Sequence, residues 1–201
     1  EDKEINVYSN NNEYSNIHLK VGLNRFIWDM KYRDPYGLEG KSIDGRRLVD
    51  LFAPPGDYKV KINTNYEEYT QTFKINKDPR SIATETDIKI QFDIMREIWN
   101  KINHSSEALN KLLNIKSESQ NWLYKCNDNQ KIVLEKPIKD INNKIFNIET
   151  ILLRNADIED VESNSKRGSF KDRGLLNRLG QLSDSIGLAD GAPTLQAQKF
   201  F

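Results

Sequence analysis

The chain has 201 residues, with 30 lysines and arginines against 30 aspartates and glutamates, and it contains one cysteine. The balanced charge gives no overall field that would attract nucleic acid or an anionic membrane, and a mean hydropathy of −0.74 with no long apolar run excludes membrane insertion. A single cysteine cannot form an internal disulfide, so a small disulfide-stapled domain is excluded and the compartment stays open. The chain starts at Glu1 without a signal-peptide pattern, and we interpret it as part of a longer polypeptide.

Residues 1–80 have the pattern of an antiparallel β-sandwich. Apolar and polar residues alternate in several short segments, which is typical of strands with one buried face. The expected strands are 17–21, 25–30, 58–62 and 69–75. Turn-forming residues separate these segments, and a polar stretch over 33–47 is expected to be a surface loop.

The apolar period changes from two to about 3.5 after Asp78-Pro79-Arg80, where we place a domain boundary. Apolar residues spaced by three and four predict amphipathic helices that must bury against each other as an antiparallel bundle. These helices are expected near 86–126, 131–154, 173–188 and 193–201, with a polar loop over 155–170. The predicted fold class is therefore α+β in two parts, a sandwich over 1–80 followed by a helical bundle over 81–201.

Two helix starts are suggested by particular residues. Thr84, Thr86 and Asp87 are candidate capping residues for the first long helix. Pro193 is suited to the first turn of the last helix, since its fixed φ matches that position.

Histidine, cysteine and carboxylate residues do not combine into a predicted catalytic centre. His18 and His104 have no second histidine or cysteine at ligand spacing, so a zinc site has weak support. Cys126 has no evident base partner, and a structural thiol is the better interpretation. The neighbouring Glu67 and Glu68 would point to opposite faces of a strand, which excludes a glycosidase pair.

Three motifs in loops are also rejected as sites. The segment Gly37–Ser42 looks like a phosphate loop, but it lacks the first glycine of that motif and the helix that should follow. The acidic cluster Asp157–Glu162 lacks the glycine and the terminal carboxylate of a calcium loop. The basic patch Lys166–Arg173 has no interleaved aromatic residues and neighbouring acids offset it, so nucleic-acid binding is not expected.

The tryptophans and one glycosylation motif complete the candidates. Trp28, Trp99 and Trp122 are expected in the core, because each lies on or beside an apolar face, and a sugar-binding platform is unsupported by their spacing. Asn103-His104-Ser105 is formally a glycosylation acceptor, but it lies on a predicted helix. The sequence therefore predicts no catalytic residue, no metal ligand and no cofactor, and it identifies no ligand-binding residue.

Three segments carry a family resemblance through their content and their order. They are GLNRFIWDMKY at 22–32, APPGDYKV at 53–60 and YTQTFKINKDPR at 69–80, and the stretches 86–93 and 175–194 continue the match. Together they resemble the C-terminal region of bacterial sortilin-like, BNR-repeat β-propeller proteins, which are often labelled glycosyl hydrolases. The stretch between Tyr32 and Phe52 is longer and more polar here than in that family.

The resemblance implies an immunoglobulin-like domain and a helical hairpin or bundle, both following a propeller. It implies no catalytic residue in this chain, because the propeller's Asp-box signature, Ser-x-Asp-x-Gly-x-Thr-Trp, has no counterpart here. Any glycosidase acid or base would lie upstream of Glu1. It also implies a secreted, periplasmic or cell-surface location.

The expected function is that of a non-catalytic C-terminal accessory region in a larger secreted propeller protein. It would support domain placement or partner binding, with the upstream propeller as its first partner and a protein or glycan as a further one. Two alternatives stay open. The chain could be the substrate-binding part of a glycoside hydrolase, or a stand-alone adhesion or oligomerisation module whose helices pair between chains.

Overall fold

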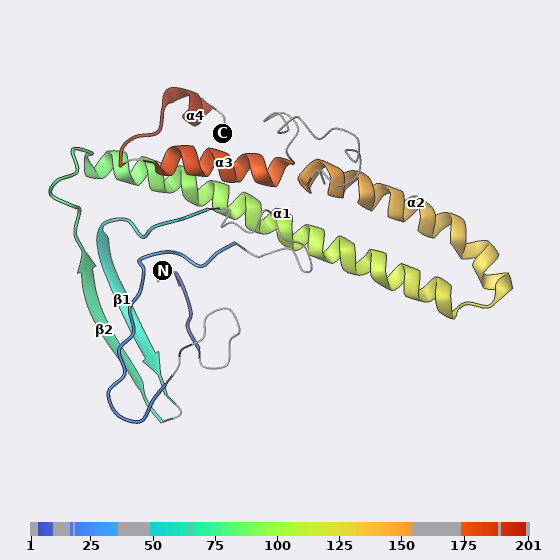
Figure 1. The fold of residues 1–201 in the computed structure, drawn as a ribbon, viewed down its shortest axis with the longest axis horizontal. Coiled ribbons are helices and arrows are strands. Elements are labelled where there is room, and N and C mark those ends of the chain that lie inside the picture. The colour runs from blue at the N-terminus through green and yellow to red at the C-terminus, as the bar shows by residue number, and fades with distance from the viewer. Residues whose placement is uncertain are drawn as a thin grey trace, which may run out of the picture. The chain divides into compact units, whose positions relative to one another are not determined.

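The computed structural model describes residues 4–9, 17, 19–35, 49–64, 66–153, 174–188 and 190–199. The elements are, in chain order, β1 (Gly56–Asn63), β2 (Glu68–Ile75), α1 (Glu85–Lys125), α2 (Asp128–Leu153), α3 (Leu175–Gly187) and α4 (Leu195–Lys199), as Figure 1 shows. The chain divides into two compact units. The first unit comprises 1–33, 50–96 and 185–201, and the second comprises 34–49 and 97–184.

In the first unit, β1 and β2 form an antiparallel hairpin in which Tyr58 lies opposite Phe73 and Ile62 lies opposite Tyr69. The connection is closed at Thr64, whose backbone N–H donates to the carbonyl oxygen of Glu67 over 2.9 Å. Side chains alternate across a strand, so the apolar residues of both strands share one face. The two strands predicted over 58–62 and 69–75 are confirmed.

The predicted immunoglobulin-like β-sandwich is wrong, because the hairpin is the whole of the sheet in the described residues. Residues 19–30 do not form strands. The Asn24 side chain closes a loop by accepting a hydrogen bond from the Lys20 N–H and donating one to the Lys20 carbonyl oxygen, both at 2.8 Å. Farther along, Met30 has a φ of 60°, which an extended strand does not permit.

Next to this segment, an isolated antiparallel bridge joins Lys31 to Phe52. Alternating residues specify which side chains share a face, but a strand also needs a neighbouring backbone to complete its hydrogen bonds. In the predicted strand 17–21, His18 lies outside the described residues.

Helix α1 begins at a capping box. The Thr84 hydroxyl accepts a hydrogen bond from the Asp87 N–H over 3.1 Å, and the Asp87 carboxylate accepts one from the Thr84 N–H over 2.9 Å. These two hydrogen bonds satisfy backbone N–H groups that have no partner within the helix at its start. Thr84 is therefore the capping residue among the three candidates.

Helix α2 begins in the same way, because Asn127 and Gln130 exchange side-chain-to-backbone hydrogen bonds. In the second unit α2 runs back along α1 (Figure 1). Lys116 forms an ion pair with the buried Glu149 over 3.6 Å, and Ser119 lies 3.5 Å from Asn142. The core of this unit includes the fully or nearly buried apolar residues Ile98, Ile102, Leu109, Ile145, Leu153 and Leu176.

Helix α3 lies alongside α1 (Figure 1). In the first unit, the buried Gln91 side chain donates a 2.6 Å hydrogen bond to the carbonyl oxygen of Ile186. This bond satisfies one of the carbonyl groups at the end of α3 that have no partner within the helix. A helix lies within or across each of the four predicted ranges, but α2 begins three residues earlier than predicted and α4 begins two residues later. Thr194 caps that helix through the Ala197 N–H, and the buried Pro193 precedes the cap instead of occupying the first turn.

Among the described helices, none combines the length and the apolar character needed to span a membrane. The expected loop over 155–170 lies outside the described residues.

Candidate binding pocket at the base of the hairpin

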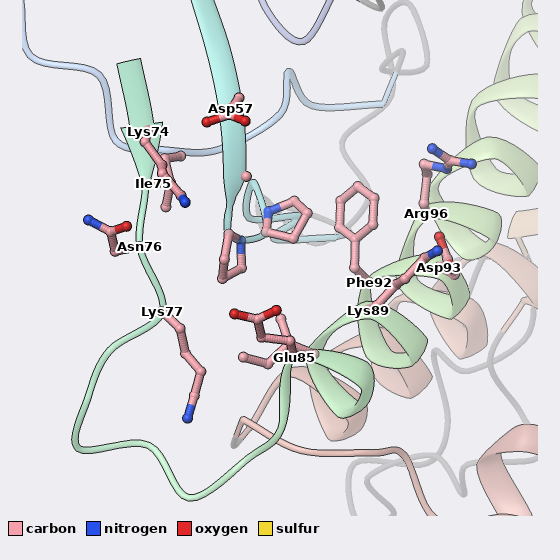
Figure 2. Close-up of a pocket in the computed structure, with 14 residues that line it drawn as sticks. Asp57, Lys74, Ile75, Asn76, Lys77, Glu85, Lys89, Phe92, Asp93 and Arg96 are labelled. Atoms are coloured by element: carbon pink, nitrogen blue, oxygen red, sulfur yellow. The ribbon is translucent and has the colours of Figure 1, made fainter.

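A cavity of about 590 Å³ opens in the first unit between the base of the hairpin and the first turns of α1 (Figure 2). The strand side contributes Pro54, Pro55, Asp57 and Lys74, and the helix side contributes charged and apolar residues from 85 to 96. The cavity is therefore built by two segments that flank the turn through Asp78-Pro79-Arg80.

The helix side of the pocket follows from simple spacing. Glu85, Lys89 and Asp93 are four residues apart, so they form one row along α1. Ile88 and Phe92 form a second, apolar row beside it. In Figure 2 the Phe92 ring rises from the helix towards the base of the hairpin.

The strand side is stiffened by two prolines. Pro54 and Pro55 have fixed φ angles and no N–H groups, which limits the conformations of the approach to β1. The Tyr58 hydroxyl donates a hydrogen bond to the carbonyl oxygen of Pro54 and ties the approach to the strand. The pocket wall is thus held by a strand residue.

Charges of both signs surround the apolar floor. Asp57 and Lys74 lie opposite each other in the strand register, and the Lys77 ammonium donates to the Ser81 carbonyl oxygen over 2.7 Å. On the helix side the Arg96 guanidinium lies 5.7 Å from the centre of the Phe92 ring, which places a cation against an aromatic face.

Aromatic rings pack behind the pocket. Phe73 lies 5.8 Å from Tyr58 and 6.1 Å from Trp28 between ring centres, and Tyr32 lies 5.6 Å from Phe92. The Trp28 indole N–H donates to the carbonyl oxygen of Lys31 over 3.1 Å. Aromatic contacts at these separations stabilise the cluster beyond area burial alone.

Burial in this cluster changes the acidity of two phenols. The pKa of Tyr58 is raised to about 12, first by burial and second by the neighbouring Tyr32. Burial also raises the pKa of Tyr32, against the opposing charge of Arg96. Both effects favour the neutral phenols that pack against the rings.

An apolar floor with a rim of both charge signs is suited to binding a polypeptide surface. The apolar floor would bury an apolar side chain of the partner, and the charged residues at the rim would pair with charged residues of the partner beside that side chain. The lining residues that the structure describes include no cysteine, histidine or serine.

The residues singled out in the sequence lie elsewhere. His104 is exposed on α1, and Cys126 is half-buried immediately after the end of α1. In the described part of the chain no group of three or more histidine, cysteine or acidic residues is placed to hold a metal ion. Several candidates fall outside the described residues, namely His18, Gly37–Ser42, Asp157–Glu162 and Lys166–Arg173.

The tryptophans differ from one another. Trp28 and Trp99 are half-buried, but Trp122 is 68% exposed, so its predicted place in the core is wrong. Asn103 is buried on α1 and donates to the Glu107 carboxylate over 3.0 Å, which leaves its amide poorly placed to accept a glycan. Glu67 accepts a hydrogen bond from the Tyr69 hydroxyl.

The pocket was not predicted from the sequence. Two signals in the sequence belong to it, the Pro54-Pro55 pair and the alternating charges at Glu85, Lys89 and Asp93. Neither indicates a site alone, because the two segments meet only when the hairpin folds against α1.

Comparison with known protein families, with curated proteins and with solved structures found no match to this chain.

Proposed function

We propose that the chain is a non-catalytic accessory region of a larger exported polypeptide. Its first unit docks onto another folded domain of that polypeptide, and the β-propeller implied by the sequence resemblance is the partner that we propose. The hairpin and the adjacent pocket supply the docking surface.

The observation that supports this proposal is the apolar face of the hairpin. Val60, Ile62 and Tyr69 lie on that face and are 44%, 57% and 57% exposed. A two-stranded hairpin is marginally stable alone, and a further packed layer stabilises it by about 25 cal/mol for each Å² of apolar surface removed from water. Exposed apolar patches of this kind are typical of interaction surfaces.

The pocket at the base of the hairpin gives the first unit a means of selecting its partner. Phe92 and Ile88 accept apolar side chains, while Lys89 and Asp93 on the helix favour opposite charges on the partner. Charges at a rim contribute more to the choice of partner than to the affinity.

Hydroxyl-radical footprinting of the native polypeptide, purified from its source with an antibody against this chain, tests the proposal. We expect Tyr69 to be oxidised readily in the isolated chain and to be protected in the native polypeptide. Tyr66, which is 94% exposed in the hairpin connection, is the matched control and should react alike in both.

Equal oxidation of Tyr69 in both samples would contradict docking through this face. A native polypeptide no longer than this chain would contradict the accessory role itself.

A further inference from the structure

The helical hairpin of the second unit has apolar side chains on an outer face. Six apolar residues that share this face are between 40% and 69% exposed: Ile115, Trp122, Val133, Ile141, Ile148 and Ile151. Each directly precedes a residue that is buried or half-buried, namely Lys116, Leu123, Leu134, Asn142, Glu149 and Leu152, and three of these residues contact the other helix: Lys116, Asn142 and Glu149.

This spacing places all six on the same side of the hairpin. One residue along a helix corresponds to a rotation of about 100°, so each exposed residue is rotated from the contact line by that angle and in the same sense. Because α1 and α2 run in opposite directions, the same sense of rotation carries both rows to one face. We name this surface the outer apolar face.

The register of the two helices pairs the rows. The contacts Lys116–Glu149 and Ser119–Asn142 fix the antiparallel alignment. The two contacts imply alignments of α1 and α2 that differ slightly. At the mean of these two alignments, Ile115 lies level with Ile148, and Trp122 lies level with Ile141. The outer apolar face therefore contains two apolar layers separated by two helical turns, about 10 Å.

We propose that the outer apolar face pairs with the same face of a second copy of this chain, forming a four-helix bundle. The two-fold axis runs parallel to the helices, so α1 of one copy packs antiparallel to α2 of the other. In this arrangement every neighbouring pair of helices is antiparallel, and the apolar layers of the two copies meet at the same level.

Charge complementarity favours a second copy as the occupant. On the flank of the face, Glu118 of α1 lies level with residue 145 of α2, beside Lys144. The two-fold axis therefore brings Glu118 of one copy to Lys144 of the second copy, and it repeats the pair on the opposite flank. A face that supplies the opposite charge at its own matching position is self-complementary.

Sedimentation equilibrium of the full chain over a range of concentrations tests this inference, with a reductant present so that Cys126 cannot link chains. We expect a mass that rises towards twice the 23.4 kDa of the chain. Trp122→Lys should raise the dissociation constant at least about tenfold, since it removes a central aromatic contact. Tyr124→Lys is the matched control, because Tyr124 is 89% exposed and follows Leu123 on the other side of α1.

A charge exchange tests the arrangement of the two copies. Glu118→Lys and Lys144→Glu should each weaken association about two- to threefold per pair, and the double variant should restore it. A constant monomer mass, equal effects of Trp122→Lys and Tyr124→Lys, or a double variant weaker than both single ones would each overturn the proposal. The proposal concerns the second unit alone and does not depend on docking by the first.

Discussion

Gly174 is a residue at which the backbone leaves no room for a side chain. It is buried, its carbonyl oxygen accepts the Arg178 N–H in the first turn of α3, and it lies against the last residue of α2. A Cβ atom added there would lie 2.4 Å from the carbonyl carbon of Leu153. Backbone cannot give way as a flexible side chain does, so the junction between α2 and α3 requires glycine.

We therefore predict that Gly174→Ala lowers the free energy of unfolding by about 2–3 kcal/mol, as overpacking against a fixed wall does. Urea denaturation followed by circular dichroism measures the change. Gly191→Ala is the control, because nothing lies within 4 Å of the position where its Cβ would be. Equal stability of the two variants would show that α2 and α3 do not meet at Gly174.

Tyr58 gives the first unit a dependence on alkaline pH. Its pKa in the folded chain is about 12, above the ordinary value of 10.0. The folded state therefore keeps the phenolic proton where the unfolded state has lost it. The resulting stabilisation is complete below about pH 10 and is lost as the pH rises towards 12.

We expect Tyr58→Phe to reduce the fall in the free energy of unfolding across that range, measured by urea titrations at several pH values. Tyr124→Phe, which removes an exposed phenol, serves as the control for the loss of a hydroxyl. If the two variants show the same slope, the half-buried position of Tyr58 is wrong.

At the scale of single elements, the start of α1 depends on the Thr84 and Asp87 capping box. Thr84→Ala should destabilise the first turn by about 1 kcal/mol, because the hydroxyl that accepts the Asp87 N–H is lost. Thr84 also lowers the pKa of Asp87 through two hydrogen bonds to its carboxylate. The destabilisation caused by Thr84→Ala should therefore be largest at pH values above the ordinary pKa of Asp87, and it should diminish as the pH falls below that value.

Hydrogen exchange of the amides at 85–88 measures this effect locally. Thr86→Ala is the matched control, because Thr86 is exposed within the same turn and alanine favours a helix there. Faster exchange in Thr86→Ala than in Thr84→Ala would contradict the capping assignment.

The elements differ in how far the sequence predicts them. Spacing of three and four is a local property that a helix satisfies with its own backbone, so the helices over 85–125 and 128–153 were predictable. The strands at 58–62 and 69–75 were predictable because each has the other as its partner. Residues 25–30 alternate in the same way, yet Met30 in a left-handed conformation interrupts any ladder there.

The pocket was less predictable than the elements that form it. The row Glu85, Lys89 and Asp93 is visible in the sequence, but the same spacing is common on solvated helices. This row lines a pocket only because Pro54 and Pro55, some thirty residues earlier in the chain, lie opposite the same turns of α1. Trp122 shows the converse, since its place near an apolar row suggested the core and the antiparallel register leaves it outside.

At the scale of the whole molecule, each unit has its own apolar surface. The first unit has the hairpin face around Ile62 and Tyr69, and the second has the outer apolar face around Trp122 and Ile141. Soluble monomers seldom leave large apolar patches uncovered. A region that docks onto a neighbouring domain through one surface and onto a second copy through the other would cover both.

The accessory role is tested most directly by the mass of the native polypeptide. Immunopurification under denaturing conditions, followed by mass spectrometry of the intact protein and of its peptides, gives both the length and the neighbouring sequence. We predict a mass well above 23.4 kDa and upstream peptides carrying Ser-x-Asp-x-Gly-x-Thr-Trp repeats. A native polypeptide of 23.4 kDa would contradict the proposed role as an accessory region of a larger protein.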